Sequence, residues 1–176
     1  MVATAPRNER FFYEDEVDVH LNPKIGPDWM VEGQQKEVLT PGQNEKRYLA
    51  GALDVQTGRL IWVEGERKTS YLFLALLDRL RQRFPRARRL HLILDNYRIH
   101  KSEIVHAALA GYLAGKIELH FLPPYCPDHN KIERVWQDLH ANVTRNHRQP
   151  TMDKLMEDVR YYLRKRNQQK QNLMAA

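Results

Sequence analysis

The sequence predicts an α/β fold built on one mixed sheet, in which antiparallel strands come first and parallel strands follow. Two observations carry this prediction. Before Thr69 the apolar residues recur in short strand-like runs joined by turns, and after Thr69 they recur with a helical period. The run 88–95, RRLHLILD, is almost continuously apolar, which is typical of a parallel strand buried on both faces and followed by a helix.

The first half of the chain is predicted to be an antiparallel meander. Residues 21–33 contain Pro or Gly at four positions, so they predict a loop or a wide hairpin turn. Gln56-Thr57-Gly58 supplies the hairpin turn between the last two strands. The predicted strands are 10–19, 37–40, 46–55 and 59–64.

The second half is predicted to alternate helices with strands. Thr69 or Ser70 caps the first helix and Pro85 stops it, while Thr151 caps the last helix, whose basic end is expected to fray. In order, the predicted elements are a helix to residue 84, a strand at 88–95, a helix at 102–113, a strand at 116–122, a helix bearing Glu133, and the last helix.

Length and composition predict one globular domain. The 176 residues are divided as a tail or linker remnant at 1–9, a catalytic domain at 10–167 and a basic, polar tail at 168–176. Cys126 is the single cysteine, which excludes a disulfide within the chain and fits a reducing compartment. No apolar run has the length of a membrane span. The net charge of +6 is consistent with a polyanionic partner.

Three acids lie on three different predicted elements, where they can converge in one cleft. Asp15 lies in the first strand, Asp95 at the carboxyl end of the first parallel strand, and Glu133 near the start of a helix. Such a trio suits phosphodiester cleavage with two Mg²⁺ or Mn²⁺ ions, because these ions prefer oxygen ligands. Other readings stay open: the acids from Glu14 to Asp18 also fit a solvated edge strand, and Glu133 with Asn130 also fits a helix cap.

Two long motifs resemble those of DDE transposases in the mariner-like and bacterial insertion-sequence superfamily. They are LILDNYRIHKS at 92–102 and LPPYCPDHNKIERVW at 122–136. The residues that match the family pattern are Asp95, Asn96 and His100 in the first motif, and Leu122, Pro123, Tyr125, Pro127, Asn130, Ile132, Glu133 and Trp136 in the second. The 37 residues between Asp95 and Glu133 are close to the family's spacing, and YEDE around Asp15 is similar to its first acid motif.

The resemblance implies a ribonuclease H-like fold and a metal-dependent DNA transposase. Asp15, Asp95 and Glu133 match the catalytic, metal-binding triad, although Glu14, Glu16 or Asp18 could replace Asp15 as the first ligand. It implies binding of element ends and target DNA, a homo-oligomer in the active complex, and a bacterial cytoplasmic, nucleoid-associated protein. The family carries a helix-turn-helix region before the catalytic domain that is missing from this chain. A truncated DNA- or partner-binding regulator and a stand-alone structure-specific nuclease are therefore the alternatives.

Residues beside the acid motifs are candidates for DNA contact. Lys101, Lys131 and Arg134 lie where a DNA backbone would pass, and cations in such positions bind phosphates. Asn96, His100 and Asn130 are expected to support the acids. For His100 the sequence leaves two roles open, since it either orients the Asp95 loop or contacts a phosphate, and a plain histidine at a helix start remains an alternative.

Overall fold

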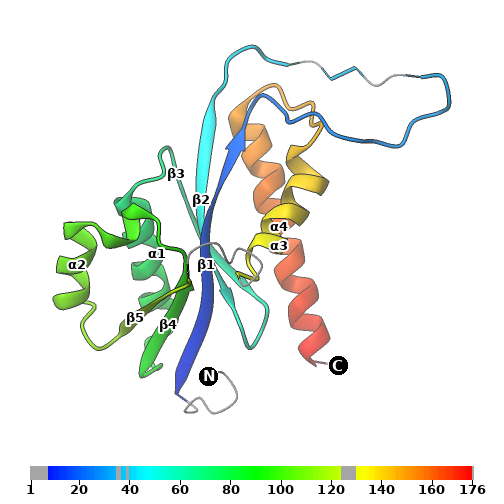
Figure 1. Cartoon of the computed structure of the whole chain (residues 1–176). Helices are drawn as coiled ribbons and strands as arrows, with labels where there is room; N and C mark the ends of the chain where they lie inside the picture. Colours follow the sequence, from blue (N-terminus) through cyan, green and yellow to red (C-terminus); the bar gives the residue numbers. More distant parts are fainter. Residues whose placement is uncertain (1–7, 35–36, 39, 124–129, 176) are drawn as a thin grey trace.

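The computed structural model describes residues 8–34, 37–38, 40–123 and 130–175. Its strands are β1 (Glu9–His20), β2 (Lys46–Asp54), β3 (Leu60–Gly65), β4 (Arg89–Leu94) and β5 (Ile117–Phe121). Its helices are α1 (Ser70–Arg83), α2 (Glu103–Ala110), α3 (Glu133–Leu139) and α4 (Met152–Ala175), with a 3-10 turn at Arg98–Lys101 and a π-helical turn at His140–Thr144. Figure 1 shows α1 and α2 on one side of the sheet and α3 and α4 on the other.

The sheet has the mixed topology that the sequence predicts. Its strand order is β3-β2-β1-β4-β5, with β1, β2 and β3 antiparallel and β4 and β5 parallel to β1. β1 is therefore the central strand, and it extends beyond the end of its pairing with β4. That unpaired edge of β1 begins at Glu14, directly before Asp15.

Each face of the sheet packs against its own pair of helices. Even-numbered positions of β1, such as Phe12, join the core with α1 and α2, and odd-numbered positions, such as Val17 and Val19, join the core with α3 and α4. This division follows from the alternation of side chains along a strand. It assigns Glu14 and Glu16 to one face and Asp15 to the other.

Several predicted elements differ from the structure. The strand predicted at 37–40 is wrong, because residues 37, 38 and 40 are not in a strand and the five strands of the sheet include no residue of this segment. The helix predicted at 102–113 ends at Ala110, where Gly111 caps it. α4 continues to Ala175, through most of the predicted tail, because no glycine or proline interrupts it. Among the described helices, none combines the length and the apolar composition needed to cross a bilayer.

Gly51 allows α3 to approach the sheet closely. It is the cross-strand partner of Asp15, and a Cβ at this position would lie 2.6 Å and 2.7 Å from two ring carbons of Trp136. The same Cβ would lie 3.3 Å from Ile132. The absence of a side chain at Gly51 therefore sets how near the first turns of α3 lie to Asp15.

We expect Gly51→Ala to destabilise the fold by about 1–3 kcal/mol, because it overpacks this contact. Denaturant unfolding measures the change. Adding Trp136→Phe should relieve the clash, so that the double variant loses less stability than the two single variants together. If the losses of unfolding free energy in the two single variants simply add up in the double variant, the predicted clash between residue 51 and Trp136 does not occur.

Candidate active site

Asp15 and Asp95 lie side by side where the parallel pairing of β1 and β4 ends. The register of these strands pairs Tyr13 with Ile93. Two residues further along each chain stand Asp15 and Asp95, the latter being the first residue after β4. By the alternation of side chains along β1, Asp15 points to the face that packs with α3 and α4, and the repulsion from Asp95 that raises the pKa of Asp15 indicates that the two carboxylates are near each other.

The two carboxylates differ in their protonation. Burial and the negative charge of Glu16 raise the pKa of Asp15 to about 7, and Asp95 adds to the rise. A hydrogen bond from His100 lowers the pKa of Asp95, which also accepts from the backbone N–H of Tyr97 at 2.8 Å. Without a further cation, Asp95 is the ionised member of the pair near neutral pH and Asp15 is partly protonated.

His100 connects Asp95 to a buried acidic layer on the opposite face of β1. Its Nδ1 lies 3.3 Å from both the carboxylate and the backbone carbonyl of Asp95, and its Nε2 lies 3.1 Å from Glu16. Burial alone would lower the pKa of His100, but its hydrogen bonds to Asp95 and Glu16 raise the pKa to about 10. His100 therefore contacts both the carboxylate and the backbone of the Asp95 loop, and its role in orienting that loop stays a prediction.

Lys68 supplies the second cation of this layer. Its ammonium lies 3.2 Å from Glu16, whose side chain is 1% exposed. The charge of Lys68 also acts on Asp15 and Asp95, and it keeps the pKa of Asp15 from rising further. Sequence analysis missed Lys68, because its position directly before a helix cap carries no signal of its contact with β1.

Glu14 is the more deeply buried acid of this layer. Its side chain is fully buried, and neither carboxylate oxygen makes a hydrogen bond within the described residues. Burial, followed by repulsion from Glu16, raises the pKa of Glu14 well above its ordinary value. Glu14, Glu16 and His100 form a compact cluster. Asp18, the last acid of the run from Glu14 to Asp18, pairs with His20.

Asn130 attaches the start of α3 to β1. Its side-chain amide donates to the backbone carbonyl of Glu14 at 2.8 Å. The residue directly before α3, Ile132, makes no side-chain cap, so the amide of Asn130 serves the strand contact and not the helix end. Glu133 is the first residue of α3 and is partly buried. Its helix packs over Gly51, beside Asp15, through Trp136 and Ile132.

The remaining predicted residues lie on the surface around these elements. Asn96 donates to the backbone carbonyl of Leu122 at 2.7 Å and accepts from the ammonium of Lys101 at 2.6 Å. Lys101, Lys131 and Arg134 are exposed, and Lys131 lies above the ring of Tyr13. Tyr125 and Pro127 of the second motif lie outside the described residues.

The acids present fit a hard divalent cation. Asp15 and Asp95 offer carboxylate oxygens, which are the donors that Mg²⁺ and Mn²⁺ prefer. The raised pKa of Asp15 means that its anionic form lacks sufficient positive charge nearby. A divalent cation between the two carboxylates would supply that charge.

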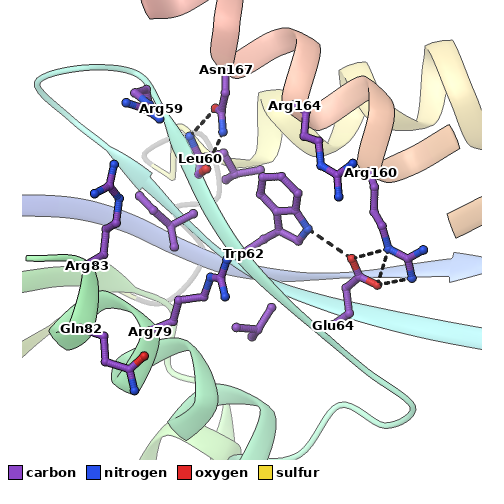
Figure 2. Close-up of a pocket in the computed structure, with 12 residues that line it drawn as sticks. Arg59, Leu60, Trp62, Glu64, Arg79, Gln82, Arg83, Arg160, Arg164 and Asn167 are labelled. Carbon is purple, nitrogen blue, oxygen red and sulfur yellow. Dashed lines mark hydrogen bonds and ion pairs between the residues drawn. The ribbon is translucent and has the colours of Figure 1, made fainter. Parts of the chain in front are cut away.

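A basic hollow of about 690 Å³ lies across the edge strand β3, away from these acids (Figure 2). Five arginines line it: Arg59, Arg79, Arg83, Arg160 and Arg164. Arg160 pairs with Glu64, and the side chain of Asn167 bonds both the N–H and the C=O of Leu60 at 2.8 Å. Among the residues that the structure describes, the other four arginines make no ion pair with an acid, so the hollow presents their positive charge beside β3.

Comparisons with known proteins agree with the motifs. The sequence matches the family model of DDE superfamily endonucleases over residues 10–156. It is 51% identical over 152 residues to an insertion element IS630 uncharacterized 39 kDa protein of Shigella sonnei, covering 86% of this chain and 44% of that protein. This chain therefore spans less than half the length of that relative.

Solved structures share the fold at low sequence identity. The Mos1 transposase paired-end complex with left transposon end gives a TM-score of 0.63 at 15% identity, covering 89% of this chain and 48% of that chain. A simian T-cell lymphotropic virus intasome in complex with PP2A regulatory subunit B56 gamma gives 0.56 at 16% identity, covering 86% and 46%. With the strand order described above, these matches confirm the predicted ribonuclease H-like fold.

Proposed function

The chain belongs to the DDE superfamily endonucleases, and from this premise we propose that it is the catalytic domain of a DNA transposase. In the first step, water hydrolyses a phosphodiester at an end of the element and frees a 3′-hydroxyl. In the second, that hydroxyl attacks a phosphodiester of target DNA, so one P–O bond forms as another breaks. Both nucleophiles are oxygens of water or DNA, so no covalent enzyme intermediate is needed.

Asp15, Asp95 and Glu133 are proposed as the ligands of two Mg²⁺ or Mn²⁺ ions. Such ions supply positive charge at the attacking and leaving oxygens of a phosphodiester. Mos1 structures with Mn and with Mg support the choice of metal by analogy. The observation that carries the proposal is the register of β1 and β4, which brings Asp15 and Asp95 together.

The chain's other residues position these acids. His100 contacts both the carboxylate and the backbone carbonyl of Asp95 through Nδ1. Asn130 links the start of α3 to β1 by its hydrogen bond to the backbone of Glu14. Glu16 and Lys68 keep His100 in a charged, hydrogen-bonded site. Fixing the ligands in advance lowers the cost of ordering them when substrate binds.

Nicking of supercoiled plasmid tests the proposal. We expect nicking with Mg²⁺ or Mn²⁺ and none with EDTA. A folded protein that does not nick with either metal would favour the truncated regulator, or a partner that completes the site. Cutting of branched DNA without regard to end sequence would favour the stand-alone nuclease.

Metal affinity should depend on pH through Asp15. Because its pKa is about 7 without metal, a cation must displace its proton, and affinity should fall by up to about tenfold per pH unit below that value. Above the pKa the affinity should level off. Calorimetric titration with Mn²⁺ in two buffers of different protonation enthalpy measures the proton released. Asp15→Asn should abolish this release, and an affinity that is constant across neutral pH would refute the assignment.

DNA contact is proposed for Lys101, Lys131 and Arg134. Removing a phosphate contact weakens binding to all sequences and reduces the slope of log K against log[salt] by about one. We therefore expect Lys131→Ala/Arg134→Ala to reduce the slope by about two. Arg79→Ala/Arg83→Ala, in the hollow across β3, removes the same charge elsewhere. If the slope of log K against log[salt] falls only in the Arg79→Ala/Arg83→Ala variant, the DNA backbone crosses the hollow and not the residues proposed here.

Assembly is proposed by analogy with the matched structures. The Mos1 structures are paired-end and strand transfer complexes. We propose that this domain also acts as a homo-oligomer on DNA, with end recognition supplied by a helix-turn-helix region outside these residues. A protein that acts on bacterial DNA would work in the cytoplasm, at the nucleoid.

A further inference from the structure

A second cluster of ligating side chains lies on β4 and β5, apart from the acids of the candidate active site. One nitrogen of His91, one nitrogen of His120 and one carboxylate oxygen of Glu118 lie within 4.8 Å of one another. His91 is the register partner of Glu118, and His120 follows two residues later on the same face of β5. The opposite face of β4 carries leucines that pack against α1 and α2. The cluster therefore occupies the face of these strands that does not join that core.

The distances within the cluster suit a tetrahedral ion. His91 Nδ1 lies 2.9 Å from His120 Nε2 and 3.9 Å from Glu118 Oε2. His120 Nε2 lies 3.8 Å from Glu118 Oε1. Zinc–ligand bonds of about 2.0–2.1 Å at tetrahedral angles set neighbouring ligand atoms roughly 3.3 Å apart. Small rotations of the three side chains would bring each distance between two ligand atoms close to that value.

The ring of His91 is oriented by a carboxylate on the side away from the cluster, as the rings of metal-binding histidines usually are. Its Nε2 lies 3.0 Å from the carboxylate of Glu9, and both side chains are largely buried. Its ring stacks on Phe11 with a centroid separation of 4.4 Å. Donation from Nε2 to Glu9 leaves a lone pair on Nδ1, directed at His120. A carboxylate behind a histidine is the usual outer partner at metal sites, because it fixes the tautomer and raises the basicity of the ligating nitrogen.

Arg89 is the competing cation at this site. It donates to Glu118 Oε2 at 2.8 Å, which leaves Oε1 on the side of His120. Glu118 and His120 remain partly exposed, so solvent can reach the cluster and an ion can enter. An arginine satisfies one carboxylate oxygen but cannot occupy the space between two imidazole nitrogens.

We propose that His91, His120 and Glu118 bind a transition-metal ion of the Zn²⁺ class, with Glu9 orienting His91. Imidazole suits Zn²⁺, Co²⁺ and Ni²⁺, whereas Mg²⁺ prefers oxygen. His91 precedes Asp95 by four residues along one strand, roughly 13 Å, so the two centres share no ligand. An ion here would tie the edge strand β5 to β4. This site does not depend on the transposase assignment.

Titration of tag-free protein with Co²⁺, followed by visible absorption, tests the proposal, and Zn²⁺ is then added as competitor. We expect one equivalent of Co²⁺ to bind with d–d bands, Zn²⁺ to displace it, and excess Mg²⁺ to leave it bound. His120→Gln should weaken binding by at least tenfold, and Glu9→Gln by about 10–100-fold. His106→Ala, on the exposed face of α2, is the matched control and should bind as the wild type does.

Asp95→Asn separates this centre from the carboxylate centre. The variant should keep the Co²⁺ spectrum and affinity of the wild type. Equal Co²⁺ binding by His120→Gln and wild type would overturn the proposal, and so would loss of the bands in Asp95→Asn. Absence of Co²⁺ and Zn²⁺ binding by the folded wild type would mean that the two histidines only share a hydrogen bond.

Discussion

Asp95→Asn is expected to lower metal-dependent DNA nicking by about 10³-fold or more, because it removes several kcal/mol of transition-state stabilisation. The substitution changes charge and not shape. The Oδ1 of asparagine can still accept from Tyr97 N–H and lie beside His100, so the loop should keep its conformation. DNA binding should stay within a few fold, since the proposed phosphate contacts at Lys101, Lys131 and Arg134 are unchanged.

Glu14→Gln is the matched control for this experiment. Glu14 is buried on the opposite face of β1, and burial raises the pKa of its carboxyl well above the ordinary value. Glutamine has nearly the same shape and lies away from the proposed metal ligands, so nicking should stay within a few fold of the wild type. Nicking by Asp95→Asn at the wild-type rate would refute the assignment of Asp95. Equal loss in Glu14→Gln would instead locate the catalytic acids in the buried layer.

Glu16→Gln is expected to destabilise the protein by about 3–5 kcal/mol, because it breaks a buried ion pair and leaves the partners uncompensated. Glu16 accepts from His100 through one oxygen and faces Lys68 through the other. A glutamine can accept through one atom only, and its amide N–H would face a cationic donor. Total stability is typically 5–15 kcal/mol, so the loss should be plain in urea unfolding.

Glu64→Gln provides the comparison for a surface pair. Glu64 makes a two-point contact with Arg160 at 2.8 to 3.1 Å, but both side chains are partly exposed. Exposed pairs contribute roughly 0–1 kcal/mol, so this variant should unfold near the wild-type midpoint. If Glu16→Gln costs no more than Glu64→Gln, the buried layer does not stabilise the Asp95 loop in the way described.

The fold could be predicted because the hydrophobic period changes at a visible point. Strand-like runs before Thr69 and helix-like runs after it predict the meander and the crossovers. The strand predicted at residues 37–40 is wrong because local strand propensity does not decide whether a segment pairs with a sheet, and the five-stranded sheet forms without it. Strand order itself came from resemblance and could not be worked out from local patterns.

The candidate site could be predicted only in part. The sequence motifs and the places of the residues in the predicted strands and helix led to the choice of Asp15, Asp95 and Glu133. Burial of Glu14 and Glu16 could not be read from the sequence, because acids are seldom buried without partners and the partners Lys68 and His100 lie far away along the chain. The proximity of Asp15 to Asp95 follows from the register of β1 with β4, which neither strand encodes by itself.

Titration with Mn²⁺ of wild type beside Glu133→Ala tests most directly the claim that Asp15, Asp95 and Glu133 bind metal together. We expect the variant to bind with about tenfold weaker affinity or more, or with one ion fewer. Glu157→Ala, which removes an exposed acid from α4, should bind as the wild type does. Wild-type affinity and stoichiometry in Glu133→Ala would contradict the three-carboxylate centre.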